Sequence, residues 1–294
     1  MSPPSPYPKY AYPPPMEAIY QGGYPQAAPY GYPTHQTDPG PGWEKVGEEL
    51  YQKRDYLEWT NPILLIFDAM MLSGLILWLF IIPIIGEIDL ADEEALANVF
   101  NPYFVLFSLI IQDGILIWMV WHQVVRRRVI PLSEMGLSKK QLSDSSSMTR
   151  MTIVGVVVGL ALFSTALAIE LGQAALGFAP VDEGILGPSE GDLTGYLIWL
   201  ISGCIIAPIS EEFFFRGYAF YAFNKKYGLW IAVFVSALGF AAIHTSIYAL
   251  LPIFVAGVGL ALAFHKTGSL VPPMVAHAVN NFLALTLLYM GFYS

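Results

Sequence analysis

Long, uninterrupted runs of apolar residues dominate the chain after about residue 60. A helix that crosses a hydrocarbon core of roughly 30 Å needs about 20 residues, and most of these runs reach that length. Polar and charged residues gather between the runs. We therefore expect an all-α fold, a polytopic transmembrane helical bundle of about seven helices, or eight if an amphipathic or re-entrant helix is included. The predicted segments are 62–86, 102–122, 151–176, 194–222, 229–246, 248–264 and 270–292.

Composition supports the membrane as the solvent and narrows the classes of function. Of the 294 residues, 55% are hydrophobic and only 13% are charged. The formal net charge of −9, without a basic stripe interleaved with aromatic residues, excludes nucleic acid as a partner. A single cysteine, Cys204, allows neither an intramolecular disulfide nor a thiolate metal cluster.

The first 45 residues differ from the rest, because they are rich in Pro, Tyr and Gly and poor in aliphatic side chains. Such a segment cannot build a core, so we predict a disordered cytoplasmic tail over 1–45 and a transmembrane domain over 46–294. A Pro-rich tail could also bind a soluble cytoplasmic partner through an aromatic-lined groove. Residues 46–61 predict an amphipathic approach helix, with Tyr56 and Trp59 at the interface.

Lysine and arginine counts predict the orientation. The connection between the second and third apolar segments carries Arg126, Arg127, Arg128, Lys139, Lys140 and Arg150. Positively charged loops stay in the cytoplasm, so this connection is expected inside, together with Lys225, Lys226 and Lys266. The acidic loops at 87–94 and 182–192 then fall outside. We expect an integral protein of a prokaryotic cell membrane, in contact with the lipid bilayer, with its N-terminus cytoplasmic and its C-terminus outside.

The fourth apolar segment contains three ionisable residues in the sequence SEEFFFR. Each charged residue at a helix centre costs about 2.5–3.5 kcal/mol on insertion scales, so each needs a partner or a purpose. Glu212 and Arg216 are four residues apart and share a helix face, which predicts an ion pair. Glu211 is five residues from Arg216 and points elsewhere, so it is expected to face a cavity as a general acid or base.

Two further segments contribute polar side chains. The fifth ends in FAAIH, with His244 in an otherwise apolar helix, although a lone buried histidine is more often a hydrogen-bonding residue than a ligand. In the seventh, His277 and Asn281 are i and i+4 and share a face, and Asn280 at i+3 could serve in place of Asn281. Polar groups on three membrane helices normally face one another, which predicts one shared site.

These residues together resemble a known family. EEFFFR, FAAIH and HAVNN match the EExxxR, FxxxH and HxxxN motifs of the CPBP family of intramembrane endopeptidases, which includes the type II CAAX prenyl proteases and the Abi-type enzymes. The resemblance covers residues 125 to 285. It implies Glu211 as the carboxylate that activates water, Glu212 and Arg216 as supporting residues, and His244 as the partner of Glu211. It implies His277 and Asn281 as the residues that hold the oxyanion.

The implied activity is that of a peptidase acting near the cytoplasmic side on membrane-associated peptides or lipidated proteins, with prenylated CAAX-type substrates as the family example. Peptide hydrolysis needs a base, oxyanion donors and exclusion of bulk water, which Glu211, His277 and Asn281 could supply. No metal site is assigned. If zinc is bound, Glu211, His244 and His277 are its candidate ligands, but no HExxH motif anchors two of them, so metal-free hydrolysis is preferred.

Other functions compete with this interpretation. A proton- or ion-coupled transporter also places carboxylates and histidines at the membrane midplane, and the same fold could serve as a bacteriocin-immunity or scaffold protein without catalysis. The serine motif GxSG is missing. GVGL at 257–260 lacks the aspartate of GxGD, while Asp68 and Asp113 are expected to pair with polar neighbours or Arg216. Cys204 is interpreted as a packing residue rather than a nucleophile.

The depths expected for the three residues in the membrane differ, which is a difficulty for one shared site. At 1.5 Å per residue, His244 would lie roughly 22 Å from the cytoplasmic end of its helix, Glu211 roughly 18 Å and His277 roughly 10 Å. Tilted or broken helices could bring them together. Pro208, Gly239 and Pro252 are candidate positions for such breaks.

Overall fold

A computed structural model describes residues 60–85, 99, 101–127, 129–178, 192–244 and 246–291. All of these belong to the compact unit Gln52–Ser294. The predicted tail over 1–45, the predicted approach helix as far as residue 59, and the acidic loops at 87–94 and 182–191 lie outside the described residues.

The described residues form helices and no strands, which confirms the predicted all-α bundle. Six helices are long and apolar enough to cross a membrane, and a seventh apolar helix is shorter. The six spans are α3 (Thr60–Ile85), α5 (Pro102–Val120) continuing into the π-helix η1 (Trp121–Val125), α7 (Ser145–Ala175), the segment Leu193–Tyr227, α12 (Leu250–Thr267) and α13 (Val271–Tyr289). The shorter helix is α11 (Leu229–Ala242), and α6 (Lys139–Ser143) precedes α7.

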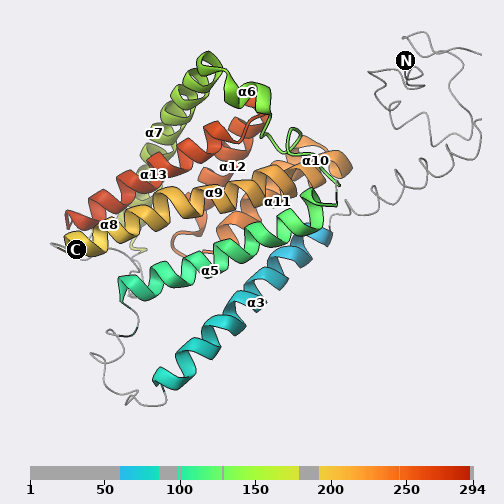
Figure 1. The fold of residues 1–294 in the computed structure, drawn as a ribbon. Helices are drawn as coiled ribbons and strands as arrows, with labels where there is room; N and C mark the ends of the chain where they lie inside the picture. Colours follow the sequence, from blue (N-terminus) through green and yellow to red (C-terminus); the bar gives the residue numbers. More distant parts are fainter. Residues whose placement is uncertain are drawn as a thin grey trace, which may run out of the picture. The chain divides into compact units, whose positions relative to one another are not determined.

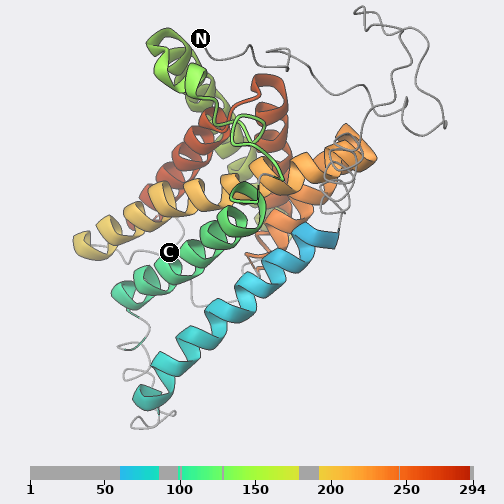
Figure 2. The ribbon, with the colours of Figure 1, turned by 45° about the vertical axis from the view of Figure 1, so that its right-hand side comes forward.

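The segment Leu193–Tyr227 is the central helix of the bundle, and it runs between α5 and α13 (Figures 1 and 2). It consists of α8 (Leu193–Ile201), η2 (Ser202–Ile206), α9 (Ala207–Glu212), η3 (Phe213–Phe220) and α10 (Tyr221–Tyr227). Every residue of η3 is buried. The core of the bundle therefore surrounds the residues that directly follow Glu212.

Two π-helical stretches interrupt the central helix. Pro208 has no N–H and its ring would clash with the carbonyl four residues earlier, so a regular α-helix cannot pass this point unchanged. The π-helix η2 ends two residues before Pro208 and relieves that clash by widening the turn. A second π-helix, η3, begins immediately after Glu212, and such π-turns are frequent at functional sites.

Helix α11 is short and stops inside the bundle. Its 14 residues span about 21 Å, less than the hydrocarbon thickness. The predicted helix over 229–246 is therefore wrong at its end, because His244 follows the helix in the connection to α12. The physical reason is local: Nδ1 of His244 bonds to the carbonyl oxygen of Phe240, the acceptor that the next helical N–H would have used.

The depth difficulty is resolved by an offset between helix ends. Gly217 on the central helix lies beside Leu270, directly before α13. The remaining residues down to Tyr227 therefore extend about 15 Å past the start of α13. Since α11 returns from that extended end, Glu211, His244 and His277 come to similar depths.

Helices α7 and α13 pack closely against each other, and glycines make this possible. Cβ atoms added at Gly155 and Gly159 would lie 2.6 Å from Cβ of Val275 and 2.7 Å from the carbonyl oxygen of Ala276. The spacing GVVVG is the small-xxx-small pattern that lets membrane helices approach closely. Because α13 carries His277, this close packing helps to set the position of the candidate site.

We predict that Gly159→Ala destabilises the protein, by about 1–3 kcal/mol, because the added methyl group overpacks a backbone contact. Reversible unfolding in detergent measures the effect. Gly172→Ala on the same helix is the matched control, since nothing lies within 4 Å of a Cβ there, and it should be neutral or stabilising. Equal effects of the two substitutions would contradict the packing argument.

Candidate active site

Arg216 is fully buried and is held by groups from three helices. Its Nη1 donates to Oε1 of Glu212 at 2.8 Å, and both side chains have 0% exposure. Its Nη2 donates to the carbonyl oxygen of Gly257 on α12 at 3.0 Å. Its guanidinium carbon lies 4.5 Å from the ring centre of Phe240 on α11. The pairing of Glu212 with Arg216 predicted from helical phase is confirmed.

His277 connects the two glutamates. Its Nδ1 lies 3.0 Å from the same Oε1 of Glu212 that accepts from Arg216. Its Nε2 lies 4.0 Å from Oε2 of Glu211. An ionised carboxylate only accepts hydrogen bonds, so Nδ1 carries the hydrogen and Nε2 is the atom left for chemistry. Glu212 thus fixes both the orientation and the tautomer of His277.

Glu211 turns away from the ion pair, as expected from its phase on the helix. Its side chain is 12% exposed, and its Oε2 is buried and accepts no hydrogen bond from the described protein groups. It lines a small cavity of about 20 Å³, large enough for one water molecule. The described residues around this cavity come from α3, α5 and the end of α11, and include Gln112 and Asp113.

His244 lies in the connection after α11, and its bonding leaves one nitrogen available. Nδ1 is 2.8 Å from the carbonyl oxygen of Phe240. A carbonyl cannot donate, so Nδ1 must carry the hydrogen, and in the neutral ring Nε2 is an acceptor. This arrangement suits a base or a water-binding group better than an oxyanion donor.

Phe240 holds the two histidines apart. Its ring centre lies 5.0 Å from that of His244 and 5.4 Å from that of His277, both edge-to-face. The same ring covers the guanidinium of Arg216. The aromatic residue of the FxxxH pattern therefore orients His244 through its carbonyl, and its ring contacts both imidazoles and the guanidinium of Arg216.

Asn281 and Asn280 form a short chain of amides on α13. Nδ2 of Asn281 donates to the carbonyl oxygen of Gly203 in η2 at 2.8 Å, and Nδ2 of Asn280 donates to Oδ1 of Asn281 at 3.2 Å. An amide nitrogen has two hydrogens, so each retains a second donor. Asn281 is the better anchored of the two, because it is tied to the central helix.

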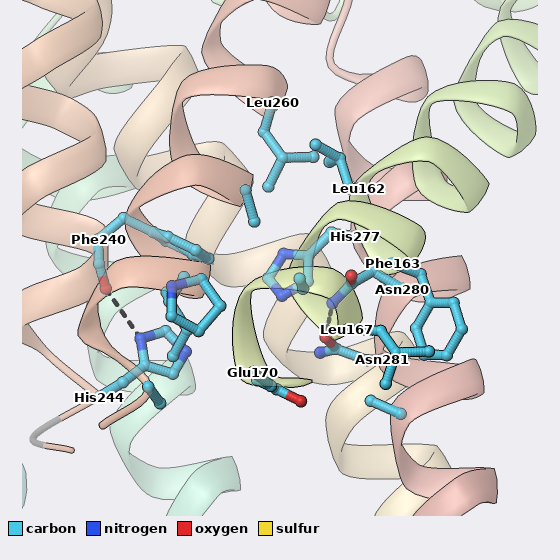
Figure 3. Close-up of a pocket in the computed structure, with 16 residues that line it drawn as sticks. Leu162, Phe163, Leu167, Glu170, Phe240, His244, Leu260, His277, Asn280 and Asn281 are labelled. Atoms are coloured by element: carbon cyan, nitrogen blue, oxygen red, sulfur yellow. Dashed lines mark hydrogen bonds between the residues drawn. The ribbon is translucent and has the colours of Figure 1, made fainter. Parts of the chain in front are cut away.

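A larger cavity of about 280 Å³ lies on the other side of His277, between α7, α13 and the α11–α12 pair (Figure 3). Its polar lining includes His244, His277, Asn280 and Asn281, whereas Glu211 lines only the small cavity among the described residues. The predicted site residues are thus brought together around two chambers: His277 lines the large one, and its Nε2 lies 4.0 Å from Oε2 of Glu211, which lines the small one. One chamber has the size of a water molecule and the other can accept part of a peptide.

The zinc alternative needs Glu211, His244 and His277 around one point. Within the described ranges, no group of three or more His, Cys, Asp and Glu side chains is arranged to hold a metal ion. These three residues as arranged do not fit a three-ligand zinc site.

A model of a known protein family matches the part of the chain that contains these residues. Residues 193–283 match the family model of Rce1-like type II CAAX prenyl endopeptidases. The match spans less than a third of the 294 residues, and it contains all six residues singled out from the sequence. It begins later than the resemblance predicted from residue 125. No curated protein and no solved structure was found to match the chain.

Two carboxylates near the Rce1-like segment were not assigned to the site from the sequence. Asp113 on α5 is 2% exposed, lines the small cavity with Glu211 and contacts Ser210 rather than Arg216. Glu170 on α7 lines the large cavity. Their presence inside membrane helices was the available signal, but nothing in the sequence states which helices pack against the central one.

We predict that Arg216→Ala destabilises the protein by about 3–5 kcal/mol, because it leaves the buried carboxylate of Glu212 without its cation. The double variant Glu212→Gln/Arg216→Met should cost much less than the sum of the single substitutions, since it removes both charges. Unfolding of the four proteins in detergent, analysed as a double-mutant cycle, measures the coupling. Additive effects would show that the pair is not coupled.

Proposed function

We propose that the chain is an intramembrane endopeptidase that hydrolyses membrane-associated peptides with water activated by Glu211. The Rce1-like match supports a membrane protease. One observation carries the mechanism: Oε2 of Glu211 is buried, accepts no hydrogen bond from the described protein groups, and lies 4.0 Å from Nε2 of a histidine fixed by Glu212. A candidate base is therefore adjacent to a candidate oxyanion donor, and the donor lines a cavity that can accept part of a peptide.

In the proposed reaction, water attacks the carbonyl carbon of the scissile bond and passes a proton to Glu211. The resulting oxyanion accepts hydrogen bonds from His277 and Asn281. The C–N bond then breaks, and the leaving nitrogen takes the proton from Glu211, which gives a carboxylic acid and an amine and restores the Glu211 carboxylate. The Nε2 acceptor of His244 assists by orienting the water.

The donor role of His277 sets a condition on its charge. With Nδ1–H directed at Glu212, Nε2 carries a hydrogen only in the imidazolium form. The formal charges of Glu211, Glu212 and Arg216 sum to −1, so one additional proton makes these three residues and His277 neutral together, with Asp113 as a further buried carboxyl across the small cavity. That proton is proposed to reside on His277 while Glu211 is the base.

The proposed substrates are peptides or lipidated proteins in the bilayer, with prenylated CAAX-type chains as the specific proposal. The predominantly apolar lining of the large cavity from α7 and α12 supports an apolar substrate segment. A tail-binding cytoplasmic partner stays a prediction, as do the prokaryotic origin and zinc dependence.

The transporter and the non-catalytic immunity or scaffold protein remain the competing proposals. A transporter relays ions between the two chambers and does not need a tautomer fixed for oxyanion binding. The sequence match to endopeptidases, and the presence of His244, Asn280 and Asn281 with His277 around one cavity, favour hydrolysis.

We predict that Glu211→Gln lowers kcat by about 10²–10⁴-fold without changing the unfolding midpoint, because it removes the general base. Cleavage of a membrane-anchored, prenylated peptide by purified protein measures the rate. Cys204→Ala is the control and should retain activity.

The same assay separates the alternatives. Cleavage that survives Glu211→Gln would refute the assigned base, and ion flux in liposomes without any cleavage would support the transporter. Loss of activity on chelation that zinc restores would support a metalloenzyme.

We also propose that the large cavity opens toward the non-cytoplasmic side, in contrast to the cytoplasmic side expected from the sequence. The described basic residues lie at the end of the bundle where α7 and α13 begin, and they include Lys139, Lys140, Arg150, Lys225, Lys226 and Lys266. The cavity extends instead toward Glu170 and Ala284, near the ends of these two helices. Positive-inside orientation then puts its mouth outside.

Thiol labelling of intact cells tests this orientation in a Cys204→Ala background. A membrane-impermeant maleimide is expected to label Leu176→Cys, at the exposed end of α7, and not Lys226→Cys. The reverse pattern would place the cavity mouth in the cytoplasm.

A further inference from the structure

Among the described residues that line the large cavity, the one carboxylate is that of Glu170, near the end of α7. The α7 residues that line the cavity follow one helix face and are Leu162, Phe163, Ala166, Leu167 and Glu170. Figure 3 shows Glu170 at the end opposite Leu162 and Leu260. No Lys or Arg is among the described residues that line this cavity. An occupant therefore meets apolar side chains and then a carboxylate.

Helix packing places Glu170 along the path of a bound chain. Gly155 lies against Val275 and Gly159 lies against Ala276, so α7 and α13 run parallel and Gly159 is level with His277. Glu170 is eleven residues further along α7, about 16 Å at the helical rise. An extended peptide advances about 3.3 Å per residue, so this offset corresponds to four or five residues.

The position of Glu170 is fixed relative to the catalytic candidates. The hydroxyl of Tyr248 donates to the carbonyl oxygen of Glu170 at 3.1 Å, and Nε2 of Gln173 donates to the carbonyl oxygen of Tyr248 at 3.1 Å. These bonds join the end of α7 to the same connection that carries His244. Asn280 lines the same cavity as Glu170 and His277. Its Oδ1 is buried and accepts no hydrogen bond from described protein groups, so it offers an acceptor to a peptide N–H.

We propose that Glu170 determines substrate specificity by binding a lysine or arginine side chain four or five residues from the scissile bond, with apolar residues between. This inference rests on the proposed peptidase activity. A carboxylate in a largely apolar cavity attracts a cation more strongly than in water and repels an anion. The free carboxylate of a substrate C-terminus therefore lies at the other end of the cavity, away from Glu170.

The test uses full-length protein in lipid nanodiscs and membrane-anchored peptides that differ at one residue only. Lys, Gln or Glu is placed three, four, five or six residues from the scissile bond, on either side. Wild type should cleave the Lys peptide with kcat/KM about tenfold above the Glu peptide at one position, mainly through KM, because a tenfold ratio is about 1.4 kcal/mol. Glu170→Gln should abolish that preference, and Glu170→Lys should reverse it.

The control variant distinguishes a local effect of the Glu170 charge from an effect of the net charge of the protein. Asp144→Asn changes the net charge equally at the exposed opposite end of α7, and it should leave the preference unchanged. Equal cleavage of Lys and Glu peptides by wild type, or a Lys preference that persists in Glu170→Lys, would overturn this inference alone. Failure of wild type to cleave any peptide would overturn the proposed function and this inference with it.

Discussion

A guanidinium buried in a membrane protein must find several acceptors at once, and Arg216 finds them on different helices. Its bonds to Glu212 and Gly257, and its contact with the ring of Phe240, join the central helix to α11 and α12. Because Glu212 also binds His277, the same ion pair reaches α13. The geometry of the candidate site depends on this one buried charge, and Glu211 is available for chemistry because its neighbour satisfies the arginine.

Much of this arrangement could be predicted from local sequence. Hydropathy located the spans, since a membrane helix must be long and apolar, and α-helical phase separated Glu211 from Glu212 correctly. The argument from α-helical phase succeeded although η3 is π-helical. The Glu212–Arg216 pair spans only the first turn of η3, where the wider winding of the π-helix has shifted the side chains little.

The remaining features depend on packing that local patterns do not encode. His244 was expected within a helix, yet its own side chain replaces the next N–H as partner of the Phe240 carbonyl and accompanies the end of α11. The sequence did not indicate that the central helix extends past the start of α13, because this offset follows from the contact of Gly217 with Leu270. Asp113 and Glu170 were visible as intramembrane carboxylates, but their cavities are defined by helices distant in sequence.

The walls of the small cavity bear on how water would reach Glu211 in the proposed hydrolase. Its described walls include Ile66 and Met70 of α3 and Asp113 of α5, all outside the segment that matches the endopeptidase family. Under the proposed mechanism, water is a second substrate with its own compartment, next to Glu211 and distinct from the cavity proposed for the peptide. Hydration of that compartment, and so the supply of nucleophile for each turnover, is then controlled by the two N-terminal helices of the described bundle. Helices that lie outside the matched segment would then set the upper limit of the rate.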